Sequence, residues 1–415
     1  MRRSPSRLSV PRLSASRLML PAAIAAGLAA AALTAPAAFA QETIKVGAPL
    51  PLTGALSPEG LKQQRGYDLW AKAVNADGGL KVGDTAYEVE IVYVDYESQT
   101  PRAVQSAERL ITEDEVNFLF SPFGSGAAKA ASSVSERYQI PTIAATASSP
   151  SVYDQGYQYL FGTFTPNDTL TTPLTDLVLE ADDTIKTIAV YARNDLFPLA
   201  IAHEAEAAAK AKGLDVLSFD EYAIGTMDHA SALTLMRTRQ PDWVFVTGYI
   251  NDLILIRRQL ADLGVAPKVL SMIAGPAYKE FIEAAGPLAD NVSSAAWWHP
   301  AVAYDGDDIF GTTADYVAAF EAEYGATPDY AEASASAAGA ILGMAIEAAG
   351  SIDPQEVREA LAQMDAVTFY GPVKFGETGQ ITSLEPPVFQ IQDGTTKVVF
   401  PEAVKQTDLV IGGIK

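Results

Sequence analysis

Short apolar runs alternate with longer amphipathic segments along most of the chain after residue 41. The runs are rich in β-branched and aromatic residues, and in the segments between them apolar residues recur at helical spacing, as Val104, Ala107 and Ile111 do. This alternation predicts strands at 44–50, 87–94, 117–120, 141–145, 187–191, 215–219 and 243–247. It predicts helices at 58–75, 101–113, 125–138, 198–212 and 230–238. Such an order is typical of parallel sheets with helices on both faces.

The strand–helix pattern comes in two runs, 44–145 and 187–272, which predict two similar lobes. Residues 147–171 between them are rich in Ser, Thr, Pro and Asn, so we interpret this stretch as a crossover and hinge. The tail predicts helices at 313–325, 331–350 and 354–364 and short antiparallel strands at 372–375, 388–391 and 397–400. The predicted fold class is therefore α/β, with two doubly wound parallel-sheet lobes.

The first 40 residues have a different character. They carry five Arg and no acidic residue, and an Ala-rich apolar run at 18–33 precedes the small residues of Ala38-Phe39-Ala40. We interpret residues 1–40 as an export signal that is cleaved off. The alternative is a membrane anchor, although the apolar run is marginal against the roughly 20 residues that a span needs. Because the chain has no Cys, no lipid can be attached to one, and we expect a protein free in the periplasm.

Charge and composition narrow the classes of partner. The chain has 29 basic and 51 acidic residues, a net charge of −22, which repels phosphate backbones and makes nucleic acid an unsuitable partner. Without Cys there are no disulfides, thiolate metal sites or Cys nucleophiles. No segment after the leader is long and apolar enough to enter a bilayer directly.

Signatures of enzymes are missing from the sequence. It contains no GxxxxGK[ST] loop, no HExxH helix and no GxSxG elbow around Ser125. The three histidines do not have metal-ligand spacing, and we expect His203 and His229 to lie on the surfaces of helices. The sequence therefore predicts a protein that is not an enzyme, with no catalytic residue, metal or cofactor, although a triad scattered along the chain stays an open alternative.

Open α/β sheets bind ligands beyond the carboxyl ends of their strands, so the loops that follow strands are the candidate binding segments. Loop 121–127 contains Phe123, Ser125 and Gly126 and leads into a helix, whose first turn offers free N–H groups to a carboxylate. The alternative is a Ser that only caps this helix.

Two further loops and an aromatic pair are candidates of the same kind. Loop 145–150 offers the hydroxyls of Thr146 and Ser148, unless it is only a turn before a proline. Tyr249, after strand 243–247, could form a pocket wall or simply pack at a helix start. Trp297 and Trp298 could line an apolar ligand site or belong to a strand between the lobes.

Five stretches together resemble a known family. They are "IKVGAPLPLTG", "GYDLWAKAVNADGGL", "IVYVDYESQTPRAVQSAERLI", "IPTIAATASSP" and "FYGPVKFGETGQ". In this order they resemble the type I periplasmic solute-binding proteins, and most of all the leucine/isoleucine/valine receptors of ABC importers. The resemblance covers nearly the whole chain after the leader.

The resemblance implies two α/β lobes joined by three crossover strands, with the ligand in the cleft between them. One lobe would comprise 42–164 and 299–371, and the other 165–298 and 372–415. The lobes would close over the ligand by hinge bending. The implied protein is a monomer that delivers a small carboxylate or amino acid to an ABC permease at the inner membrane. A ligand-sensing module with the same fold is an alternative.

The family's ligand residues transfer one at a time to this sequence. Ser125 corresponds to the Ser that holds the ligand carboxylate, and Thr146 and Ser148 correspond to the backbone and hydroxyl positions of the next loop. Tyr249 corresponds to the Tyr of the second lobe. Glu59 stands where amino-acid receptors often have an aromatic residue.

One departure from the family concerns the ligand's ammonium group. Ala274 stands where leucine-type receptors have an acidic residue, and a buried ammonium without an anion is costly. Either Glu59 or Glu332 replaces that acid, or the ligand has no ammonium. The resemblance thus leaves two ligand classes: a branched-chain or other hydrophobic amino acid, and an aromatic or aliphatic carboxylate without an amine. Trp297 and Trp298 fit the second class.

Overall fold

In the computed structural model, which describes residues 42–415, a first six-stranded sheet is built around β1 (Glu42–Leu50). Its strand order is β2-β3-β1-β4-β5-β6, parallel except for the antiparallel pairing of β2 with β3. The inner part of β1 is a nearly continuous apolar run because helices cover both faces of a parallel sheet. The other strands are β2 (Leu80–Val82), β3 (Thr85–Asp95), β4 (Phe118–Phe120), β5 (Thr142–Ala144) and β6 (Leu160–Gly162).

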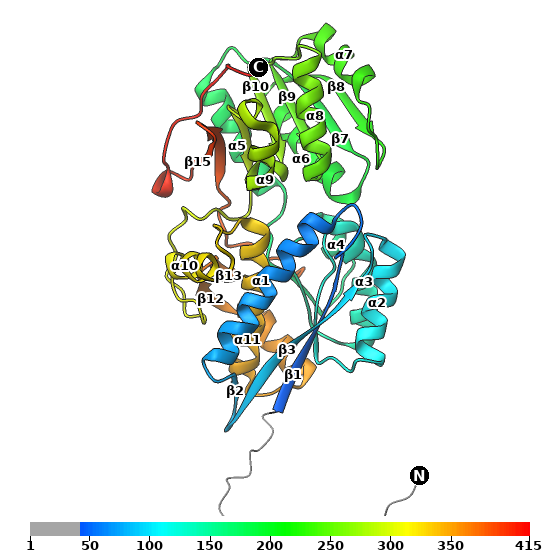
Figure 1. Ribbon diagram of the computed structural model, residues 1–415, viewed down its shortest axis with the longest axis vertical. Helices are drawn as coiled ribbons and strands as arrows, with labels where there is room; N and C mark the ends of the chain where they lie inside the picture. Colours follow the sequence, from blue (N-terminus) through cyan, green and yellow to red (C-terminus); the bar gives the residue numbers. More distant parts are fainter. Residues whose placement is uncertain (1–41) are drawn as a thin grey trace, which may run out of the picture. The chain divides into compact units, whose positions relative to one another are not determined.

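Helices flank this sheet on two sides, α1 and α11 on one and α2 and α3 on the other (Figure 1). α11 packs along α1, although the two helices are far apart in sequence. The helices of this half are α1 (Ser57–Ala76), α2 (Thr100–Thr112), α3 (Ser125–Tyr138), α4 (Pro150–Tyr153), α10 (Thr313–Tyr324), α11 (Tyr330–Ala349) and α12 (Pro354–Ala362). A hairpin of β12 (Asp365–Thr368) and β13 (Gly371–Lys374) lies beside them. We call the first sheet and these elements the first half.

A second sheet has seven strands in the order β15-β14-β11-β10-β9-β7-β8. The five strands from β11 to β8 are parallel, and β14 and β15 are antiparallel. The strands are β7 (Thr187–Arg193), β8 (Asp215–Tyr222), β9 (Trp243–Thr247), β10 (Val269–Ile273), β11 (Val292–Ala295), β14 (Val388–Gln392) and β15 (Thr395–Phe400).

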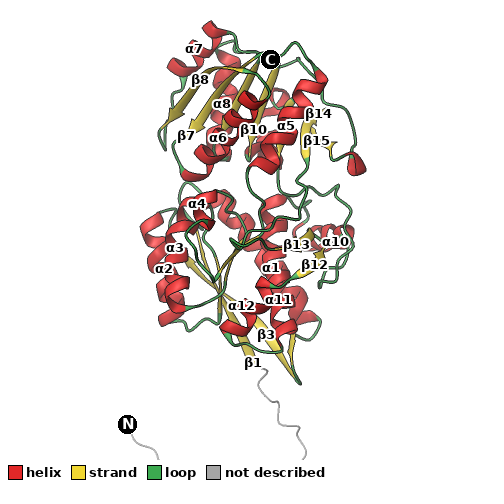
Figure 2. Cartoon of the chain, turned by 180° about the vertical axis from the view of Figure 1, so that it is seen from behind, coloured by secondary structure: helices red, strands yellow, loops and turns green. Residues whose placement is uncertain are grey.

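Five helices and three short 3-10 turns accompany the second sheet, and Figure 2 shows α5, α6 and α8 around it. The helices are α5 (Asp168–Ala181), α6 (Leu196–Ala211), α7 (Ala230–Arg239), α8 (Ile250–Asp262) and α9 (Lys279–Ala285). The 3-10 turns are η1 (Gly275–Ala277), η2 (Gly286–Leu288) and η3 (Glu402–Val404). These elements and the second sheet form the second half. The chain passes between the halves after β6, after β11 and after β13.

The α/β prediction is confirmed, and the predicted antiparallel strands at 388–391 and 397–400 are β14 and β15. The strand β2, which was not predicted, also pairs antiparallel, so both sheets are mixed at their edges. The stretch 147–171 is not only a crossover, since it contains α4, β6 and the start of α5. Within residues 42–415 no single helix has the length and apolarity of a membrane span; only α11 and α12, bent by 110°, pass that test as a pair. The predicted export signal lies outside the described residues.

The expectation for His229 was wrong, because this histidine is buried. It directly precedes α7 instead of lying on its outer face, and its Nδ1 is 2.8 Å from the hydroxyl oxygen of Tyr191. The rings of Tyr191 and Tyr222 pack edge-on against it. His203 is exposed on α6, as expected.

Candidate ligand-binding site

A narrow cavity lies where the carboxyl ends of strands from both sheets meet. From the first half it is lined by residues after β4, β5 and β6 and at the start of α11, and from the second half by residues after β7, β9, β10 and β11. The lining residues are Phe123, Gly124, Thr146, Phe164, Phe197, Tyr249, Ala274, Trp297 and Tyr330. The open space between them is only about 10 Å³, roughly the room of one water molecule. This is the position at which open α/β sheets bind ligands.

Six of the nine lining side chains are aromatic, and none of the nine carries a charge. Phe164 stacks on Trp297 with ring centroids 3.9 Å apart and planes 5° apart. The ring of Tyr249 packs against those of Phe123 and Phe197, at 5.6 and 6.1 Å. Flat apolar walls of this kind suit a flat apolar ligand body, which can stack on them or meet them edge-on.

One end of the cavity is polar. Thr146 lines it, and the Thr146 hydroxyl accepts a long hydrogen bond of 3.5 Å from the Gly124 N–H, just before α3. Behind Thr146, the buried Oγ of Ser125 accepts hydrogen bonds from the N–H groups of Ser148 and Ser149, both at 3.2 Å. The Oγ of Ser148 is buried and has no hydrogen-bond partner among the described residues. The start of α3 and these hydroxyls make this end suitable for an anion.

Gly124 and Ala274 adopt unusual backbone conformations on opposite sides of the cavity. Gly124 has φ +81°, and a Cβ at this position would lie 3.1 Å from the Tyr249 hydroxyl, so glycine allows that hydroxyl to approach the start of α3. Ala274, after β10, has φ 89°, where an L-residue with a side chain is strained. Such strain concentrates at functional sites, which supports the cavity as the site of ligand binding.

Glu59 lies close to the cavity without lining it. It is in the first turn of α1, its exposed fraction is 1%, and its Oε1 accepts a 3.2 Å hydrogen bond from the N–H of Ile250, the first residue of α8. Its Oε2 is buried without a partner among the described residues. Burial raises the pKa of Glu59 to about 7, against the lowering effects of backbone hydrogen bonds and of Lys62.

Comparison with known proteins identifies the family. The model of the periplasmic binding protein family matches residues 43–395. This chain belongs to that family. It is 29% identical to the Leu/Ile/Val-binding protein homolog 8 of Brucella suis biovar 1 (strain 1330) over 402 residues, which cover 93% of this chain and 96% of the relative. Family membership confirms the predicted resemblance and the prediction of a receptor instead of an enzyme.

Solved structures of the same fold confirm the two-sheet architecture of this periplasmic binding protein. The isoleucine-bound LivJ of Streptococcus pneumoniae superposes with a TM-score of 0.76 at 23% identity, covering 87% of this chain and all of that one. A solute-binding protein of R. palustris in complex with benzoate gives a TM-score of 0.75 at 21% identity, covering 89% of this chain and 99% of that one.

Six of the predicted ligand residues do not line the cavity of this binding protein. Three of them, Ser125, Ser148 and Glu59, are described above, and the other three are Glu332, Trp298 and Gly126. The carboxylate of Glu332 pairs with Arg65 and accepts the N–H of Asp329 at 3.0 Å. Burial, and then repulsion by Asp329, raise the pKa of Glu332 to about 7. Trp298 packs edge-on against Tyr316 at 5.8 Å. Gly126 lies in the first turn of α3, one residue after Ser125.

Several lining residues of the binding protein were not predicted. Phe197 follows β7, so the rule that ligands bind after strands would have found it. Phe164 follows β6, a strand that lies inside the stretch 147–171, which the sequence predicts to be a crossover and hinge. Tyr330 begins α11, which follows α10 instead of a strand in the chain, and no sequence signal points to it.

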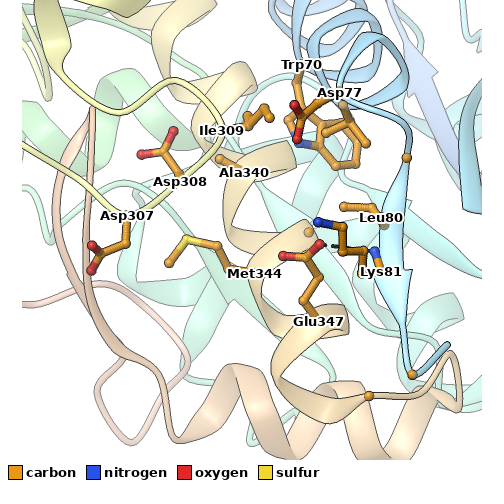
Figure 3. A pocket seen from close by; sticks show the side chains of 15 residues that line it. Trp70, Asp77, Leu80, Lys81, Asp307, Asp308, Ile309, Ala340, Met344 and Glu347 are labelled. Carbon is orange, nitrogen blue, oxygen red and sulfur yellow. Dashed lines mark hydrogen bonds between the residues drawn. The ribbon is translucent and has the colours of Figure 1, made fainter. Parts of the chain in front are cut away.

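A second, larger hollow of about 820 Å³ lies in the first half, beside the C-terminal ends of α1 and α11 (Figure 3). Asp77, Lys81, Asp307 and Glu347 are among its lining residues, and the Lys81 N–H donates to the Glu347 carboxylate at 3.1 Å. None of the predicted ligand residues lies there. Among residues 42–415, no group of three His, Asp or Glu side chains could hold a metal ion.

Proposed function

We propose that this protein is the solute receptor of an ABC importer, and that its ligand is a small carboxylate with a flat apolar body and no amine, such as an aromatic acid. The observation that carries the proposal is the cavity lining, which is aromatic on most sides, free of charged side chains and polar at one end. The ligand is held and released without chemical change.

The polar end of the cavity would hold the ligand carboxylate. The start of α3 supplies free N–H groups and the positive end of the helix dipole, and Thr146 supplies a hydroxyl. The Ser148 hydroxyl is buried without a partner among residues 42–415, as expected of a group that a polar ligand atom satisfies. Ser125 would act indirectly, because its Oγ holds the backbone of Ser148 and Ser149 in place.

The other walls support a ligand without an ammonium group. Ala274 lines the cavity where leucine-type receptors have an acid, and no other acidic side chain lines it. A buried ammonium would be left without an anion, which is costly. The aromatic walls would enclose a ring, and the R. palustris protein shows that this fold is compatible with benzoate.

A hydrophobic, branched-chain amino acid is the second candidate ligand. The full-length relatives named Leu/Ile/Val-binding protein homologues favour it. Glu59 favours it as well, because its Oε2 is buried, has no partner in the described part of the chain and could meet an ammonium near the cavity. This candidate requires Glu59 to be ionised in the complex.

For the mechanism, we propose that the protein has the two lobes that the sequence predicts. One lobe comprises 42–164 and 299–371, and the other comprises 165–298 and 372–415. A ligand that contacts both lobes binds the closed form better, and this difference drives closure. After removal of residues 1–40 the receptor would act in the periplasm as a monomer and deliver its ligand to a permease. A sensing role uses the same fold, and permease and ATPase genes beside the receptor gene would distinguish the two.

A ligand panel tests the proposed ligand class. Thermal unfolding of the purified protein is followed with benzoate, 4-hydroxybenzoate and phenylacetate, and with leucine, isoleucine, valine and phenylalanine. We expect only the acids without an amine to raise the melting temperature, because a ligand that binds the folded state stabilises it. Stabilisation by the amino acids alone, or by neither set, would overturn the proposed ligand class.

A further inference from the structure

We propose that Glu59 takes up a proton when the two halves close over an anionic ligand, so that a carboxylate without an amine binds together with a proton and a zwitterionic amino acid binds without one. The inference rests on the proposed function, because it assumes that a carboxylate occupies the cavity. The carboxyl group of Glu59 would then be neutral when an anionic ligand is bound and ionised when a zwitterion is bound.

The first argument is the position of Glu59 at the junction of the two halves. The residue belongs to α1 of the first half, and its Oε1 accepts the N–H of Ile250 in α8 of the second half. The side chain is almost fully buried, and its Oε2 has no partner among the described residues. The carboxyl group of Glu59 is therefore shielded from water only while α1 and α8 are in contact, and it is hydrated again when they separate.

The second argument concerns the groups that face Glu59 from the elements around it. Two are charged: Lys62, one turn further along α1, and Asp252 in the first turn of α8. The others are the phenols of Tyr96 after β3, Tyr249 before α8, Tyr278 before α9 and Tyr330 at the start of α11. Burial raises the pKa of each phenol, so all four stay neutral.

Lys62 does not neutralise Glu59 by itself. Its ammonium is 2.7 Å from an Asp329 oxygen and 2.9 Å from a Glu280 oxygen, so two other carboxylates share its charge. Lys62 and Asp252 shift the pKa of Glu59 in opposite directions, and burial outweighs both. A ligand carboxylate nearby adds a negative charge and favours protonated Glu59, whereas an ammonium favours the ionised form.

The sign of the pH dependence follows. The pKa of Glu59 is raised from 4.5 to about 7 in the closed protein, and we expect it to return toward 4.5 when the halves separate. Between these values closure takes up a proton, so affinity for an amine-free carboxylate falls as pH rises, by up to about tenfold per pH unit. Below and above this window the affinity levels off. For a zwitterion we expect a nearly flat profile.

Calorimetric titration with benzoate tests the inference. Near pH 6, titrations in two buffers of different ionisation enthalpy give the number of protons taken up, and a series from about pH 5.5 to 8.5 gives the affinity profile. In the Glu59→Gln variant, which keeps an oxygen for the Ile250 N–H, we expect binding without proton uptake and with a flat profile. Leucine, if it binds the native protein, should do so without uptake.

Glu332→Gln is the matched control. Glu332 is also buried and has a raised pKa, but Arg65, Asp329 and Lys62, which face it, all belong to the first half, so closure should change its environment less than that of Glu59. Uptake approaching one proton in the native protein and in this control supports the inference. Benzoate binding without uptake in the native protein, or equal uptake in Glu59→Gln, overturns it and leaves the proposed function standing. Leucine binding without any benzoate binding overturns the proposed function itself.

Discussion

At the scale of single residues, three hydroxyls at the polar end of the cavity have different roles. Thr146 lines the cavity, and Ser125 holds the backbone of Ser148 and Ser149. The hydroxyl of Ser148 is buried and has no partner within the part of the chain that the structure describes. Sequence resemblance assigned the carboxylate contact first of all to Ser125. In the structure Thr146 is the hydroxyl in the most direct position to meet a ligand.

We therefore expect Thr146→Val to weaken benzoate binding about tenfold or more. The change keeps the shape of the side chain and removes the hydroxyl, and a buried polar group that loses its partner costs about 1–3 kcal/mol. Calorimetry measures the dissociation constant. Thr238→Val, on the outer face of α7, is the control and should bind as the native protein does. Equal affinities in all three proteins would contradict the role of Thr146.

At the scale of elements, the close packing of α1 against α11 positions the site. α1 carries Glu59 in its first turn and α11 carries Tyr330 at its start. The two helices approach closely because Gly339 of α11 faces Trp70 of α1: a Cβ on Gly339 would lie 2.2 Å from the Trp70 ring. Trp70 is fully buried and cannot easily move away.

Gly339→Ala should lower the free energy of unfolding by about 1–3 kcal/mol, the usual cost of an extra methyl in a packed core. Urea denaturation measures the change as a lower midpoint. Gly126→Ala in α3 is the matched control, because its Cβ would have no contact closer than 3.5 Å and alanine favours a helix. We expect its stability to be unchanged or slightly raised. A Gly339→Ala protein as stable as the control would show that the helices can separate without cost.

At the scale of the whole described chain, a small set of polar contacts joins the two halves around the cavity. Lys62 of the first half bridges Asp329, on its own side, and Glu280 of α9 on the other side. The Tyr278 hydroxyl donates to the Tyr330 hydroxyl at 2.7 Å, and their rings are stacked. Because Lys62 is buried, its charge depends on these partners.

Lys62→Met should lower the free energy of unfolding by roughly 3 kcal/mol, since the buried carboxylate of Asp329 loses its cationic partner. It should also weaken benzoate binding, because the halves lose a bridge. Lys72→Met is the control: its pair with Glu323 is more exposed and lies within the first half. An exposed pair contributes about 0–1 kcal/mol. Urea denaturation and calorimetry measure both effects, and equal losses in the two variants would contradict the bridging role.

Sequence patterns located most elements because their signals are local. Strand β9 and helix α3 have the predicted bounds, since each is a run of uniform periodicity between clear turn signals. β6 and α5 were missed because polar residues around them resemble a linker, and Leu160–Gly162 becomes a strand only by pairing with β5. His229 was misplaced for a similar reason, since its burial depends on Tyr191 and Tyr222.

The sequence by itself determined the strand–helix order, the family, the class of receptor and the loops that contain Thr146 and Tyr249, because each of these depends on residues close together in the chain. Tertiary structure decided which side chains meet. It brought Phe164, Phe197, Trp297 and Tyr330 together as aromatic walls of the cavity. It also gave the two Glu residues different surroundings: Glu59 lies at the junction of the halves, whereas Glu332 forms an ion pair with Arg65. Burial and contact between distant segments control the charge of a carboxyl group, and no local pattern encodes them.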